Sequence, residues 1–214
     1  MDPLYLLLVF SAMSMVPLLA VMVTSYTKII IVTSLLRNAL GLQNVPPPTV
    51  TSGIAIILTF FVMYPVGYEA LGKQDHLRGG MQLGSTTQML GLAQSAREPL
   101  RKFLAKHSGE KERQFFLQTA KEIMPPEVAA DIKPDDLVIL APAFTLSELT
   151  SAFEIGFLLF LPFILIDIIV ATVIMTLGMQ MLSPTIISLP FKLLLFVVLD
   201  GWTKLFQVMV LSYR

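Results

Sequence analysis

Hydrophobic residues along this chain gather in four stretches, which are separated by short polar breaks and by one long polar region. The stretches run over residues 4–32, 50–71, 152–177 and 186–211. Each reaches or exceeds the roughly 20 residues with which an α-helix crosses a hydrocarbon layer of ~30 Å. The pattern predicts an all-α fold of membrane-associated helical hairpins, built on four long apolar helices.

The long polar region, residues 72–136, holds ten of the fifteen basic residues and nine of the fifteen acidic residues. This composition predicts a small, water-facing helical insertion. Its apolar residues recur at helical spacing in two segments, first Leu100, Phe103, Leu104 and His107, then Phe116, Ala120 and Ile123. Met124-Pro125-Pro126 should end the second helix, because proline cannot continue a helix and restricts the residue before it.

The chain thus divides into an N-terminal apolar hairpin (1–71), the polar insertion (72–136) and a C-terminal apolar hairpin (137–214). The first helix should stop at Gly41, ahead of the breaker Pro46-Pro47-Pro48. Hydrophobic residues make up 55% of the chain and charged residues 14%, whereas about a quarter of the residues in a soluble domain are charged. With a mean hydropathy of +0.74, this composition favours a membrane protein in contact with lipid and disfavours a soluble enzyme.

A start signal stands ahead of the third apolar stretch. Thr145 and Glu148 have the spacing of a capping box, which predicts a helix that begins at Leu146. If it runs to Leu177, the helix is about 48 Å long at ~1.5 Å per residue, more than a bilayer core requires. Over-long helices of this kind suit a stacked assembly.

Charge and motifs exclude several classes of function. Basic and acidic residues each number 15, so the chain lacks the basic excess typical of nucleic-acid binding. It has no cysteine, and neither His76 nor His107 has a further ligand at metal-binding spacing. No phosphate-binding glycine loop or nucleophile motif occurs. We expect no enzyme activity, no catalytic residue, no metal, no cofactor and no nucleic-acid partner.

Six ionisable residues interrupt the apolar stretches: Lys28, Glu154, Asp167, Lys192, Asp200 and Lys204. A charge left in lipid costs roughly 2.5 to 3.5 kcal/mol on insertion scales, so each needs a partner, a wet cavity or the interface. Three acids balance three bases, which favours structural pairing between helices and subunits, in an assembly, over an ion or proton pathway. Asp200 and Lys204 lie one turn apart and could pair.

A methionine-rich segment, residues 175–184, separates the last two apolar stretches. Gly178 and Pro184 predict a hairpin tip with a hinge, and the next helix should start near Leu189-Pro190. Methionine side chains re-pack easily, so several copies meeting on an axis could close a pore and yield to a passing chain. The alternative is that these methionines, Met175, Met179 and Met181, only fill a core.

Three motifs in this order resemble a known family: Leu36 to Pro47 (LRNALGLQNVPP), Pro142 to Leu149 (PAFTLSEL), and Ile187 to Phe196 (ISLPFKLLLF) with Asp200-Gly201-Trp202. They are similar to the R subunit of the type III secretion export apparatus, the SctR family, whose flagellar counterpart is FliP. The resemblance spans nearly the whole chain and is least specific over residues 72–136.

The resemblance implies a core subunit of a pore that carries unfolded protein substrates across the bacterial inner membrane. In that family the subunit forms a pentamer, joined by the S and T subunits into a helical gate raised largely above the membrane, with the V and U export-gate subunits as further partners. The family's methionine-rich loop forms a gasket, which by position falls on Met175, Met179 and Met181. Flagellar members tend to have consecutive methionines, whereas Gln180 interrupts the series here.

Topology follows from the apolar stretches and the loop charges. The N-terminus enters apolar sequence directly, without the features of a cleaved signal, which indicates a retained anchor and the injectisome branch of the family. Four spans place both termini on one side. Arg37 in the first connection favours a cytoplasmic location for that loop, so the polar insertion would be periplasmic.

Two other functions stay open at this point. One is an ion- or proton-coupled small-solute transporter that uses Glu154 and Asp167, although the two halves of the chain show no convincing internal repeat. The other is a non-conducting scaffold that nucleates the export machine.

Overall fold

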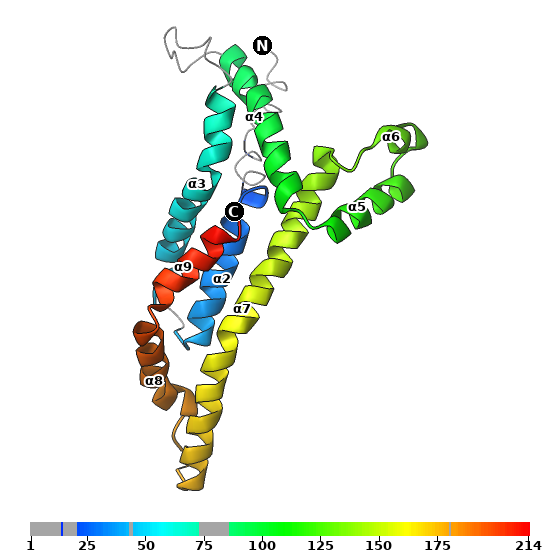
Figure 1. The fold of residues 1–214 in the computed structure, drawn as a ribbon. Coiled ribbons are helices and arrows are strands. Elements are labelled where there is room, and N and C mark those ends of the chain that lie inside the picture. Colours follow the sequence, from blue (N-terminus) through cyan, green and yellow to red (C-terminus); the bar gives the residue numbers. More distant parts are fainter. Residues whose placement is uncertain (1–13, 15–20, 43–44, 73–85, 180) are drawn as a thin grey trace. The chain divides into compact units, whose positions relative to one another are not determined.

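The structure is a computed structural model that describes residues 14, 21–42, 45–72, 86–179 and 181–214. Within these ranges the elements are all helices, as the all-α prediction expects (Figure 1). Most of the first apolar stretch, 4–32, and His76 lie outside the described residues. The helices are α2 (Tyr26–Ala39), α3 (Pro48–Gly72), α4 (Thr86–His107), α5 (Glu110–Ile123), α6 (Pro126–Asp131), α7 (Leu137–Thr176), α8 (Pro184–Val198) and α9 (Gly201–Leu211).

Among the described residues, α3 and α7 are long and apolar enough to cross a membrane, and α8 with α9 would make a third span bent by 61°. The prediction of a single helix over residues 186–211 is therefore wrong. Asp200 adopts the left-handed conformation, with φ +51°, and breaks the helix. Aspartate is one of the few residues other than glycine that adopt this conformation. Apolar sequence on both sides concealed the break.

Helix α7 begins at Leu137, so the predicted start at Leu146 is wrong. Thr145 lies inside the helix, where its hydroxyl donates to the Ala141 carbonyl at 2.9 Å. The first turn instead follows Asp136, whose carboxylate accepts a hydrogen bond from the Lys133 backbone N–H at 2.7 Å. The helix has 40 residues, or about 60 Å at ~1.5 Å per residue.

The polar insertion forms the two predicted amphipathic helices, α4 and α5, and a third, α6. Helix α5 ends where Met124 takes an extended conformation ahead of the two prolines, as predicted. The short helix α6 was missed, because the same Pro125-Pro126 pair that ends α5 also opens α6. Proline is tolerated in a first turn, since those N–H groups have no partner in the helix.

Helix α8 begins at Pro184, so its predicted start near Leu189-Pro190 is also wrong. The Ser183 carbonyl accepts the backbone N–H groups of Ile186 and Ile187. Pro184 fits the first turn for the reason given for α6, and Pro190 is accommodated inside the helix.

The chain divides into two compact units. Unit 1 comprises Met1–Thr27 with Thr59–Glu148, and unit 2 comprises Lys28–Leu58 with Leu149–Arg214. In unit 1 the rings of Phe103 and Phe144 pack 5.6 Å apart in the core. The units group residues by contact, whereas the three sequence regions group them by polarity, so those regions remain a prediction.

The core of unit 2 is drawn from α2, α7, α8 and α9. Its buried apolar residues include Ile29, Val32, Phe163, Phe196 and Met209. At Gly156 of α7 a Cβ atom would lie 2.2 Å from Cδ1 of Leu35 in α2. Two helices approach closely there because glycine has no side chain.

Candidate functional site

A short connection joins α7 to α8 (Figure 1). Two backbone hydrogen bonds cap the end of α7 there. Gly178 N–H donates to the Met175 carbonyl at 3.0 Å, and Met179 N–H donates to the Ile174 carbonyl at 3.1 Å. This is the Schellman arrangement, which requires a left-handed residue, and Gly178 has φ +73°. Glycine takes this conformation without a steric penalty, so the backbone at the predicted hinge is well defined.

All three predicted gasket methionines are exposed on the chain. Their exposed fractions are 67% for Met175, 49% for Met179 and 101% for Met181. Leu177 and Leu182, beside them, are exposed too. The methionines therefore fill no core within this chain and are available to contact another molecule.

Away from the turn, an ion pair joins α7 to α8. Lys192 is 2% exposed, and its Nζ lies 2.6 Å from Oδ2 of Asp167. The hydroxyl of Ser188 donates to Oδ1 of the same carboxylate at 2.5 Å. A buried charge is tolerated when it is paired and hydrogen-bonded, and the buried ammonium of Lys192 is paired with a carboxylate that is itself 36% exposed.

Lys192 also reaches the end of α2, where its Nζ donates to the Ala39 carbonyl at 3.1 Å. Helix α2 ends in the same Schellman arrangement as α7, with Gly41 at φ +77°, so the predicted stop at Gly41 is confirmed. A Cβ at Gly41 would lie 3.6 Å from Cγ2 of Thr185 and 3.7 Å from Cδ1 of Leu189. One ammonium group, in the middle of α8, thus ties together the end of α2 and the bodies of α7 and α8.

Lys28 is buried as well, and its partners come from the C-terminal end of the chain. Its Nζ lies 3.4 Å from Oγ of Ser212 and 4.3 Å from the ring centroid of Tyr213. A cation over an aromatic ring is stabilised by the electron density of the ring face. Lys28, Asp167 and Lys192 all have partners inside unit 2, as structural pairing expects.

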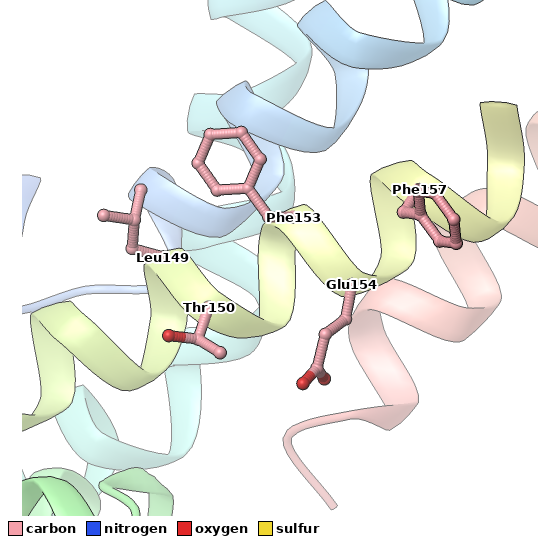
Figure 2. A pocket seen from close by; sticks show the side chains of 5 residues that line it. All are labelled: Leu149, Thr150, Phe153, Glu154 and Phe157. Atoms are coloured by element: carbon pink, nitrogen blue, oxygen red, sulfur yellow. The ribbon is translucent and has the colours of Figure 1, made fainter.

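The other three predicted charges, Glu154, Asp200 and Lys204, are exposed on the chain. Asp200 and Lys204 share a backbone hydrogen bond, but their side chains form no ion pair in the part of the chain that the structure describes. Their burial in an assembly remains a prediction. Glu154 lies on an outer face of α7, in a shallow depression of about 480 Å³ lined by Leu149, Thr150, Phe153, Glu154 and Phe157 (Figure 2).

Unit 1 holds a polar depression of about 430 Å³ where α4 meets the segment before α7. Arg101 lies 3.1 Å from Glu98 and 3.8 Å from Asp135, and Arg113 lies 3.9 Å from Asp135. Hydrogen bonding and attraction by Glu98 raise the pKa of Arg101, which keeps this arginine charged. Acids and bases balance here, so the depression selects no charged ligand.

The described residues hold no group of three metal-ligating side chains. The ring of His107 packs 4.7 Å from the ring of Phe103. Sequence reasoning missed Ser188, the Ala39 carbonyl and Tyr213 as partners of the buried charges. Their residue types carry no signal of this role, and only the three-dimensional arrangement brings them to the charges.

The comparison with known proteins decides the family, since residues 9–209 match the FliP family. The chain belongs to the FliP family. It is 52% identical over 204 residues to the hypersensitivity response secretion protein HrcR of Ralstonia nicotianae, covering 95% of this chain and 94% of that protein. It is 46% identical to the Yop proteins translocation protein R of Yersinia pestis, covering 99% and 97%. With the flagellar biosynthetic protein FliP of Bacillus subtilis it shares 39% identity, covering 97% and 90%.

Proposed function

We propose that this FliP-family chain is a core, pore-forming subunit of a type III protein secretion export gate in the bacterial inner membrane. Its relatives are named for secretion, translocation and flagellar biosynthesis, and the described residues hold two or three candidate membrane spans. The higher identity to the secretion protein HrcR than to flagellar FliP, 52% against 39%, supports the injectisome branch.

One observation supports the mechanism: Met175, Met179 and Met181 are exposed at the connection between α7 and α8, two helices that the Lys192–Asp167 ion pair joins. Thioether side chains are flexible and apolar. Copies of the turn around an axis would form an apolar constriction, which blocks ions by dewetting and yields to a passing polypeptide. Met175, Met179 and Met181 are the proposed gasket, with Gly178 and Pro184 at its base.

The proposal includes assembly, because the isolated chain exposes many large apolar side chains along α3 and α7. Such surfaces are stable only in lipid or against other subunits. We include as partners further copies of the chain in a pentamer, the S and T subunits, the V and U subunits and unfolded substrates. The first connection is assigned to the cytoplasm and the polar insertion to the periplasm.

The transporter alternative receives little support. Asp167, one of its two proposed carboxylates, is already engaged by Lys192 and Ser188. Replacing Glu154 by Gln tests whether the other carboxylate carries protons. Loss of a proton current from an intact assembly would favour the transporter.

Substitution of the gasket tests the proposal. Met179→Ala and Met181→Ala shorten the apolar side chains, so ion leakage in cells that express the whole export apparatus should rise. Met181→Leu is the matched control, because it keeps an apolar side chain of similar size and should preserve the seal. Wild-type leakage and secretion in both alanine variants would contradict the gasket.

Substrate contact needs a separate test. A photoreactive amino acid placed at Met179 or Met181 should cross-link to a secretion substrate that is stalled in the gate. The same probe at the exposed Phe115 of unit 1 serves as the control and should give no adduct. A complete apparatus without adducts at the turn would favour the non-conducting scaffold.

A further inference from the structure

The outer face of α7 carries an isolated carboxylate among apolar side chains. Its exposed residues recur at one helical face: Leu149, Thr150, Phe153, Glu154 and Phe157 (Figure 2). The two phenylalanines are 54% and 65% exposed, and Glu154 makes no side-chain hydrogen bond or ion pair with the described residues. Covering this face would remove its carboxylate from water, so the covering surface has to supply a cation.

The outer face of α9 carries the complementary charge. Leu205 and Met209 are buried, and the opposite side exposes Thr203, Lys204, Gln207, Val208 and Leu211. The ammonium of Lys204 makes no side-chain hydrogen bond or ion pair within the described ranges. The two faces have the same spacing of exposed positions, and each carries polar side chains one turn apart.

We infer that the α7 face of one copy of the chain packs against the α9 face of a second copy, with Glu154 paired to Lys204. In an antiparallel arrangement the four-residue step from Glu154 back to Thr150 runs alongside the three-residue step from Lys204 forward to Gln207. These steps are about 6 and 4.5 Å long, so Thr150 and Gln207 would lie near each other as a second polar pair. The inference rests on the proposed multi-copy gate and adds the contact between its copies.

The pairing also has a consequence for symmetry. The two faces belong to different helices, so each copy can offer its α7 face to one neighbour and its α9 face to another, which makes a heterologous contact. Heterologous contacts generate rings when the rotation closes. A two-fold dimer could satisfy the same pairing only if both faces met a single partner, with each Glu154 opposite the Lys204 of the other copy.

Cross-linking tests the contact directly, because the chain contains no cysteine. Chains with Glu154→Cys and chains with Lys204→Cys, differently tagged and expressed together with the whole apparatus, should form a covalent dimer of the two tags. The control pairs Glu154→Cys with Arg214→Cys, an exposed cation beyond the end of α9, and should yield little dimer. Equal cross-linking in the control, or no dimer with Lys204→Cys, would overturn the inference.

Charge exchange gives an independent test. Glu154→Lys and Lys204→Glu should each lower the yield of the multi-copy complex about tenfold or more, while the double exchange should recover most of it. Circular dichroism of the purified single variants should show wild-type helix content, which separates lost assembly from misfolding. A double variant no better than the single ones would refute the pair.

The wild-type complex separates failure of the contact from failure of the proposed function. If wild-type chains form a multi-copy complex and the gasket substitutions cause leakage, while Glu154 and Lys204 fail both tests, only the contact is wrong. If wild-type chains form no such complex, the proposed gate fails, and the contact fails with it.

Discussion

Ion pairs occur in both units, but in different surroundings. In unit 1, Lys102 lies 2.9 Å from Glu69, and the two side chains are 60% and 42% exposed. In unit 2, Lys192 lies 2.6 Å from Asp167, and the two side chains are 3% and 36% exposed. Water competes for both partners of the first pair, whereas in the second pair it reaches Asp167 but not the ammonium of Lys192. The comparison indicates that unit 2 uses charge to fix geometry, while unit 1 uses it mainly at a solvated surface.

The largest effect should come from removing the buried cation. Lys192→Met leaves the Asp167 carboxylate, whose side chain is 36% exposed, without its ammonium partner, which should cost about 3 kcal/mol of stability. Thermal unfolding of the purified protein measures the loss. In the double variant Lys192→Met, Asp167→Leu, no charge is left unpaired and much of the stability should return; a double variant as unstable as the single one would contradict this account.

Close packing in unit 2 predicts the next effect. A Cβ at Gly156 would lie 2.2 Å from the side chain of Leu35, so Gly156→Ala should destabilise unit 2 by about 1 to 3 kcal/mol. Gly53→Ala is the control, because nothing lies within 4 Å of the new methyl group and alanine favours a helix. Denaturant titration of both variants gives the difference, and equal stability would show that α2 and α7 do not approach closely at this point.

A smaller effect is expected at the hairpin turn. Gly178→Ala forces a side chain into the left-handed conformation, at a cost of about 1 to 2 kcal/mol, while Gly178→Asn should cost less. Stability and ion leakage can be measured on the same variants. If alanine and asparagine behave alike, the left-handed geometry of the turn is not what matters.

The exposed pair should matter least. Lys102→Gln is expected to change stability by no more than about 1 kcal/mol, and 1 M salt should remove the difference from wild type. Comparing melting temperatures at low and high salt checks this result. A loss as large as that of Lys192→Met would erase the distinction between the two units.

Local signals in the sequence predicted two of the helix ends. The Gly41 stop and the end of α5 at Met124 follow from local backbone chemistry, and both are confirmed. Thr145 and Glu148 misled because capping-box spacing also occurs inside helices, and Asp136 had already provided the start. At Asp200 the apolar pattern runs on through a break that a left-handed aspartate makes.

The candidate site was predictable in its residue types but not in its partners. The six interrupting charges stood out because charge is costly in an apolar segment. That Lys192 would meet Asp167, 25 residues away, or that Lys28 would meet Ser212, 184 residues away, depends on how the helices pack. Periodicity within one segment carries no such long-range information.

The contacts of Lys192 with Asp167 and the Ala39 carbonyl affect how fast the proposed methionine gasket could open for a substrate. Asp167 lies about 12 Å along α7 from Met175, at ~1.5 Å per residue, so the helices near the turn have little freedom to separate. The gasket would then open through rotation of the methionine side chains. Exposed side chains change rotamer within picoseconds to nanoseconds. As a polypeptide passes, the methionine side chains would rearrange faster than a helix can move. Closure of the gasket behind the polypeptide would need no input of energy.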